Sequence, residues 1–139
     1  MPSQLLQPLK KSFWIWPIGL SLATQALDVV ITYRFIARET NPLLLIFWRS
    51  WISPFWLPLI WTAVYLGVAY YFYAQANNPR RAVQILFAVA LGHLCGVLSW
   101  TPLNFISSAT ESFFILIFAL VIGAVSDRLS QWYLLRYAA

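Results

Sequence analysis

Long apolar runs alternate with short polar connections along the chain of 139 residues. Four of these runs are long enough for membrane helices and cover about residues 13–36, 54–75, 80–103 and 109–127. A helix rises about 1.5 Å per residue, so a run of about 20 residues crosses the hydrocarbon core of a bilayer. The pattern predicts an all-α integral membrane protein, a four-helix bundle in which residues 1–139 form a single transmembrane domain.

A capping residue followed by proline precedes the third run, at Asn78-Pro79. This pair favours a helix start, because asparagine accepts from a free backbone N–H and proline lacks the N–H that would be unpaired there. The same pair occurs at Asn41-Pro42, but the apolar run that follows it is too short to cross a bilayer. We predict a short interfacial helix there, over about residues 42–52, between the first and second spans.

The composition agrees with a membrane protein. Hydrophobic residues make up 61% of the chain and charged residues 9%, against roughly a quarter charged in an ordinary soluble domain. None of the nine Lys and Arg residues belongs to a run longer than two, which argues for the lipid bilayer and against nucleic acid as a partner. With four spans, both termini lie on the same side of the membrane, and six of the basic residues flank the spans on that side: Lys10, Lys11, Arg80, Arg81, Arg128 and Arg136. The positive-inside rule then places both termini in the cytoplasm.

The first span carries a polar stripe. Ser21, Gln25, Asp28 and Thr32 step by four, three and four residues, so they share one face of a helix and are expected to face protein. A carboxylate at the bilayer centre costs about 2.5–3.5 kcal/mol, so Asp28 needs a partner, water or a bound proton. His93 lies at a compatible depth on the third span, and we hypothesise that the two pair. A histidine that simply hydrogen-bonds to a neighbouring helix is the alternative.

Two short elements follow one another here, Asp28-Val29-Val30-Ile31-Thr32 and Glu39-Thr40-Asn41-Pro42. They resemble the Asp-x-x-x-Thr and Glu-x-Asn-Pro elements of small bacterial and archaeal membrane proteins grouped as domain of unknown function family 5658. The resemblance is close over about 15 residues and elsewhere extends only to size and hydropathy. It implies a compact multi-span helical protein of a prokaryotic inner (plasma) membrane, and it carries no established activity.

The candidate ligand- or proton-binding residues are Asp28, Thr32, Glu39, Asn41 and His93. Asn41 can equally serve only as a helix cap, and Glu39 as a solvated partner of the adjacent arginine. The catalytic residues, if any, are unknown. We expect no metal site, because the chain lacks His-Glu-x-x-His and Cys-x-x-Cys motifs, and the sequence identifies no cofactor.

Small residues on the third span predict close helix packing. Ala88, Gly92 and Gly96 stand four residues apart, which lets two helices approach closely. This row of small residues, the seam, could pack against another helix of the same bundle. It could also join copies into a homo-oligomer or a larger membrane complex through Gly92 and Gly96.

Asp127 is expected to form a surface pair with Arg128. Aromatic residues at span ends are expected to form belts at the membrane interfaces: Trp14, Trp16, Trp48, Trp51, Trp56, Trp100, Trp132 and Tyr133.

The chain has few polar and ionisable residues, which favours a protein that is not an enzyme. We predict an accessory subunit or a small-ligand-binding subunit with an outward-facing polar pocket. The first alternative is a small homo-oligomeric transporter or proton-linked carrier, in which Asp28 titrates and His93 relays the proton. The second is an intramembrane enzyme, which would need Asp28, His93 and Glu39 to converge on one point.

Overall fold

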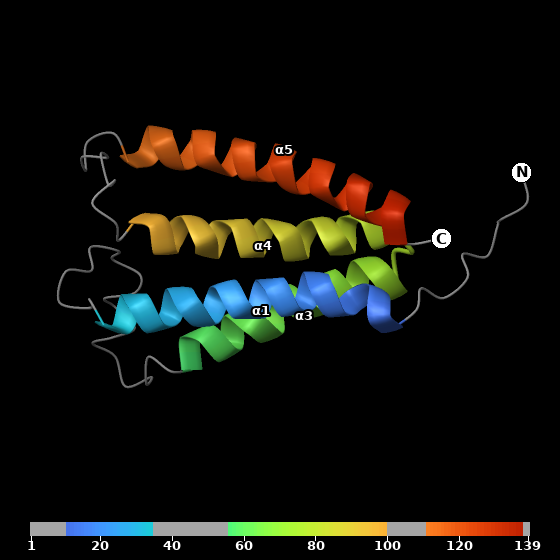
Figure 1. The fold of residues 1–139 in the computed structure, drawn as a ribbon, viewed down its shortest axis with the longest axis horizontal. Helices are drawn as coiled ribbons and strands as arrows, with labels where there is room; N and C mark the ends of the chain where they lie inside the picture. Colours follow the sequence, from blue (N-terminus) through green and yellow to red (C-terminus); the bar gives the residue numbers. More distant parts are fainter. Residues whose placement is uncertain (1–10, 35–55, 100–110, 138–139) are drawn as a thin grey trace, which may run out of the picture.

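Residues 11–34, 56–99 and 111–137 are described in the computed structural model of the chain. The regular structure in these ranges is α-helical, as the sequence predicts, and consists of α1 (Lys11–Arg34), α3 (Trp56–Ala74), α4 (Pro79–Ser99) and α5 (Glu111–Tyr137). Figure 1 shows that α1 and α4 begin, and α3 and α5 end, at the same end of the molecule. We call this end the basic end, because the described lysine and arginines other than Arg34 lie near it: Lys11, Arg80, Arg81, Arg128 and Arg136.

Helix α4 is central to the packing, because it contacts α1, α3 and α5. Figure 1 shows it between α5 on one side and α1 and α3 on the other. One cluster of buried side chains joins α1, α4 and α5: Phe13, Val83, Phe87 and Tyr133. A second cluster joins α3 and α4: Tyr65, Ala69, Ala82 and Leu86. The described core therefore follows α4 along its first half.

The turn between α3 and α4 confirms the predicted cap. Asn77 has a φ of 46°, a left-handed conformation that asparagine tolerates at the end of a helix. The backbone N–H of Asn78 donates to the carbonyl of Phe72 at 2.7 Å and closes the end of α3. The side-chain oxygen of Asn78 then accepts from the N–H of Arg81 at 3.1 Å, and Pro79 is the first residue of α4.

Three described segments are long and apolar enough to span a membrane: Ser12–Arg34, Trp56–Ala74 and Pro79–Leu98. They coincide with the first three predicted spans. The predicted fourth span, 109–127, falls on α5, but α5 continues for ten residues beyond it, to Tyr137. The extension is a packed helix, since Ser126, Ser130 and Tyr133 are buried at helical spacing. The predicted interfacial helix over about 42–52 lies outside the described residues.

A hydrogen bond from α5 fills a gap in the backbone pairing of α1. Pro17 lies inside α1 and has no N–H, so the carbonyl of Phe13, four residues earlier, lacks its helical donor. The hydroxyl of Tyr133 donates to this carbonyl at 2.6 Å, and Tyr133 is only 4% exposed. The prediction that Tyr133 belongs to an aromatic belt is therefore wrong: the side chain is buried because its hydroxyl completes α1.

We expect Tyr133→Phe to lower the free energy of unfolding by about 1–3 kcal/mol, because phenylalanine fills the same space but leaves the buried Phe13 carbonyl unpaired. Reversible unfolding in detergent micelles, followed by circular dichroism, measures the change. Tyr137→Phe is the matched control, since Tyr137 is 48% exposed on the same helix. Adding Pro17→Ala to Tyr133→Phe should recover part of the loss, because alanine supplies the missing N–H. A double variant no more stable than Tyr133→Phe would contradict this account.

Candidate functional site

The polar stripe of α1 faces the interior of the described helices, as predicted. Ser21, Gln25 and Thr32 are buried, and Asp28 is partly buried among them. Ser21 donates to the carbonyl of Ile18 in its own helix at 2.8 Å. Asp28 is thus the one ionisable group of the stripe, with Thr32 one turn further along the same face.

Asp28 and His93 are in direct contact. The Oδ2 atom of Asp28 lies 2.8 Å from the Nδ1 atom of His93, and the two side chains are 21% and 17% exposed. When Asp28 is ionised it can only accept, so the imidazole donates from Nδ1. In a neutral imidazole the Nε2 atom then carries a lone pair and can accept a hydrogen bond or a proton. Within the described residues, Nε2 makes no hydrogen bond.

Gly96 makes room for the carboxylate of Asp28. A Cβ atom at Gly96 would lie 2.8 Å from Oδ1 and 3.0 Å from Oδ2 of Asp28, closer than side chains pack. Gly92, one turn earlier, is exposed, and a Cβ atom there would meet nothing within 4 Å. The two glycines of the predicted seam therefore differ. Gly96 packs within the chain, against the site, while Gly92 lies on the surface of the described part.

Gln25 ties α1 to α3 beside the site. Its amide nitrogen donates to the carbonyl of Pro58 at 2.9 Å. Its amide oxygen accepts from the hydroxyls of Thr62 at 2.9 Å and Tyr65 at 3.0 Å. Sequence reasoning missed Thr62 and Tyr65, although Thr62 interrupts an otherwise apolar and aromatic helix. Because this buried amide both donates and accepts within the protein, Gln25 acts as a link between helices.

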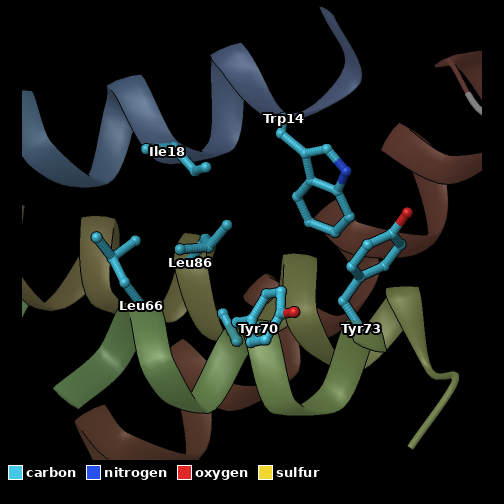
Figure 2. Close-up of a pocket in the computed structure, with 7 residues that line it drawn as sticks. Trp14, Ile18, Leu66, Tyr70, Tyr73 and Leu86 are labelled. Atoms are coloured by element: carbon cyan, nitrogen blue, oxygen red, sulfur yellow. The ribbon is translucent and has the colours of Figure 1, made fainter. Parts of the chain in front are cut away.

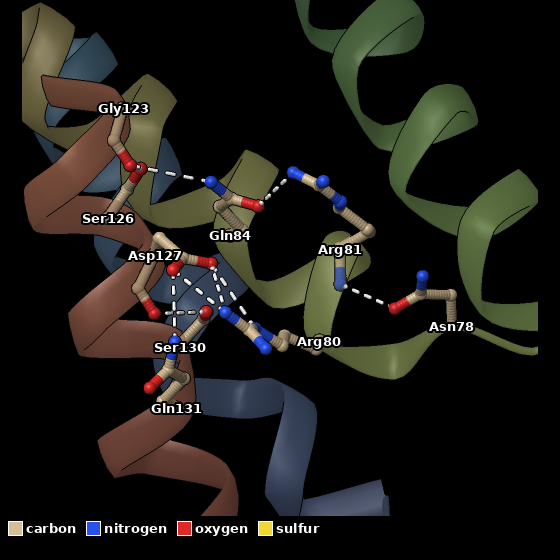
Figure 3. Close-up of polar contacts among 9 residues, drawn as sticks. All are labelled: Asn78, Arg80, Arg81, Gln84, Gly123, Ser126, Asp127, Ser130 and Gln131. Atoms are coloured by element: carbon tan, nitrogen blue, oxygen red, sulfur yellow. Dashed lines mark hydrogen bonds and ion pairs between the residues drawn. The ribbon is translucent and has the colours of Figure 1, made fainter. Parts of the chain in front are cut away.

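A separate polar network joins α4 to α5 at the basic end (Figure 3). The Nη2 atom of Arg80 lies 2.8 Å from each carboxylate oxygen of Asp127, and Gln131 donates to Oδ2 at 3.0 Å. The prediction that Asp127 pairs with Arg128 is therefore wrong, because the antiparallel packing of α4 and α5 brings Arg80 to it. Both side chains are well exposed, at 48% for Arg80 and 31% for Asp127, so water screens the pair and it serves as a surface clamp.

Of the other candidates, Thr32 lies one turn beyond Asp28 on α1, and Glu39 and Asn41 lie outside the described residues. Among the residues whose placement is described, no group of three or more His, Cys, Asp or Glu side chains could hold a metal ion. Comparisons of the chain with protein-family models, curated proteins and solved structures found no match. Function is therefore inferred from the contact between Asp28 and His93.

Proposed function

We propose that this chain is a four-span integral membrane protein of a prokaryotic inner membrane, and that it binds a small polar ligand at Asp28 and His93 without catalysing a reaction. Its role is that of a small-ligand-binding or accessory subunit. The observation that carries the proposal is the 2.8 Å contact between these two side chains inside apolar helices. An ionisable pair in such a place is costly to insert, and a functional site is its default interpretation.

Membrane insertion is supported by the surface of the described helices. Large apolar side chains are exposed there, including Trp16 at 71% and Leu135 at 85%. Three helices contain segments of sufficient length and apolarity to span a bilayer. For the fourth span we propose the first part of α5, where residues 113–125 include no charged residue. Four such helices packed around α4 would form the proposed bundle.

The proposed orientation makes the site open outward. The positive-inside rule assigns the basic end, with both termini, to the cytoplasm. Asp28 and His93 each lie six residues before the last residue of their helix, Arg34 and Ser99, at the opposite end. Six residues correspond to about 9 Å of helix. A ligand from outside would therefore reach the pair after a short descent into the bundle.

The chemistry of the pair indicates the class of ligand. With Nδ1 donating to Asp28, the Nε2 atom of His93 offers an acceptor, and the carboxylate beside it adds negative charge. Both features favour a small molecule that carries an amine or another hydrogen-bond donor. The partial exposure of both side chains leaves them within reach of such a molecule.

The apolar side chains on the cytoplasmic side of Asp28 and His93 favour binding over transport. Beyond Ser21, the buried side chains of α1 and α4 toward the basic end are apolar: Phe13, Pro17, Ala82, Val83, Leu86 and Phe87. In the described residues, the buried polar side chains of this helix pair are thus Ser21 and the residues outward of it, Gln25 and Thr32. The proton-linked carrier is the second candidate, favoured by the ability of a carboxylate and an imidazole in contact to share a proton. The enzyme alternative depends on Glu39 and stays a prediction, as does the family resemblance.

Substituted-cysteine labelling tests the proposal. In a Cys95→Ala background, which removes the one native thiol, His93→Cys in sealed vesicles should react with a membrane-impermeant thiol reagent added on the outside only. Leu86→Cys is the matched control, because Leu86 lies two turns nearer the basic end and is 1% exposed, so neither side should label it. Labelling of His93→Cys from the cytoplasmic side alone, or from neither side, contradicts the proposal. Labelling from both sides would favour the carrier.

A further inference from the structure

One face of α5 points away from the other described helices. It lies opposite Ser126, Ser130 and Tyr133, which are buried at helical spacing. The first part of this face is exposed and apolar: Ile117, Val121 and Val125. The last part, which we call the arginine face, is also exposed: Arg128, Trp132, Leu135 and Arg136. Figure 1 shows α5 at the edge of the bundle, with its last turns at the basic end.

The described residues offer no carboxylate partner to the arginine face. Of the four acidic residues of the chain, Asp28 and Asp127 are paired with other residues. Glu111 begins α5 at the opposite end, and Glu39 lies outside the described residues. The positive charge of the two arginines therefore suits a partner that brings negative charge from outside the chain.

Trp132 positions one of these arginines. The Cζ atom of Arg136 lies 5.6 Å from the centre of the Trp132 ring, a cation–π contact. The indole is 52% exposed, and the side chain of Leu135 is 85% exposed. Such a mixture is typical of the level of lipid headgroups, where rings and methyl groups contact acyl chains and guanidinium groups stay in the polar layer. The arginine face thus combines positive charge with apolar contact area.

The position of the arginine face along α5 agrees with this level. In the proposed bundle the fourth span reaches Val125, and Arg128 lies three residues further, about 4.5 Å of helix. The headgroup layer begins at this distance and extends about 5–8 Å beyond the hydrocarbon core. Side chains of a helix lean toward its N-terminus, so those of Trp132 and Arg136 lean back toward the bilayer. Because the arginine face continues directly from the apolar part of the same face, a lipid is favoured over an acidic protein as its partner.

We propose that the arginine face binds the headgroup of an anionic phospholipid of the cytoplasmic leaflet. Its two arginines donate charge-assisted hydrogen bonds to the phosphate oxygens, and Trp132 and Leu135 contact the acyl chains. A headgroup with net negative charge is preferred over a zwitterionic one, because it balances both guanidinium charges. This inference rests on the proposed membrane insertion and orientation, and not on the proposed ligand at Asp28 and His93.

The apolar pocket between α1, α3 and α4 is separate from the arginine face. It has a volume of about 420 Å³, and α5 contributes none of its described lining residues. Figure 2 shows the indole of Trp14 facing the ring of Tyr73 in this pocket. Its described lining is apolar and aromatic and includes no charged side chain. The charge that would distinguish one lipid headgroup from another therefore lies on α5.

Native mass spectrometry of the detergent-solubilised protein tests the proposal. The protein is titrated with phosphatidylglycerol and with phosphatidylcholine of the same acyl chains. An arginine near an anionic surface contributes about fivefold to affinity, so two should give a preference for phosphatidylglycerol of about 25-fold. Arg136→Gln should lower this preference about fivefold. Adding Arg128→Gln should abolish it without weakening phosphatidylcholine binding. Equal binding of both lipids by the unsubstituted protein would overturn the proposal, and an acidic protein would then be the alternative partner.

Arg81→Gln is the matched control for the arginine variants. It removes one exposed charge at the same end of the bundle, but on α4, where the side chain bonds to Gln84. The preference for phosphatidylglycerol should stay unchanged. If Arg81→Gln and Arg136→Gln lower the preference equally, the assignment to α5 is overturned, because only the net charge of the protein then matters.

Trp132→Leu should lower the preference about two- to fivefold, because it releases Arg136 from the cation–π contact. Trp16→Leu is its control, since Trp16 is 71% exposed on α1. Full preference in Trp132→Leu would contradict the positioning role of the indole. Asp28→Asn should bind both lipids as the unsubstituted protein does, so the lipid proposal can fail while the Asp28 and His93 site stands, and the reverse also holds. Loss of the preference with Asp28→Asn would show that the arginine face is not a separate site.

Discussion

Gly96→Val should separate Asp28 from His93 and lower the free energy of unfolding by about 1–3 kcal/mol, the usual cost of overpacking. A Cβ atom at position 96 would already lie 2.8 Å from Oδ1 of Asp28, and valine adds two methyl groups to it. Asp28 is a short side chain held by His93, so it can escape only by giving up the 2.8 Å contact. The substitution is therefore expected to damage the site and the packing of α1 on α4 together.

Gly92→Val is the matched control for this prediction. It makes the same change one turn earlier on α4, where a Cβ atom meets nothing within 4 Å. We expect a change in unfolding free energy within about 0.5 kcal/mol, as for other surface substitutions. Reversible unfolding of both variants in detergent micelles, followed by circular dichroism, gives the comparison. If the two valine substitutions lower the free energy of unfolding equally, the close packing of Gly96 against the Asp28 carboxylate is contradicted.

Much of the helical framework could be predicted from the sequence, because local signals determine it. The apolar runs place α1, α3 and α4, and the Asn78-Pro79 pair places the start of α4. The polar stripe of α1 follows from the helical period alone. Asp28 and His93 could be matched in depth because α1 and α4 run in the same direction, and each residue lies six positions before the end of its helix.

The contacts between helices could not be predicted, because they depend on how the helices are rotated against one another. Gly92 and Gly96 are equivalent in the small-residue pattern, and only the packing of α1 against α4 assigns Gly96 to Asp28. Tyr133 is buried because a proline 116 residues earlier, Pro17, leaves a carbonyl without a donor. Asp127 meets Arg80, which is 47 residues away in sequence, in place of the adjacent Arg128.

Asp28→Leu should release His93 from its fixed tautomer while the helices stay folded. The substitution removes a hydrogen bond worth about 1–3 kcal/mol. It also removes a carboxylate that costs about 2.5–3.5 kcal/mol to place in the bilayer, so the two effects on stability largely cancel. Unfolding experiments are therefore a poor test of this residue. The imidazole itself is the sensitive probe, and Asp127→Leu is the control, because Asp127 pairs with Arg80 at the basic end.

The most direct measurement is the nitrogen-15 NMR spectrum of the protein labelled in the histidine ring and placed in bilayers. His93 is the one histidine of the chain, so the spectrum reports a single imidazole. We predict that Nδ1 carries a hydrogen that is bonded to Asp28, a state unchanged in Asp127→Leu and lost in Asp28→Leu. A ring protonated on Nε2 with a bare Nδ1, or the same tautomer with and without Asp28, would contradict the assignment of Asp28 and His93 as a paired binding site.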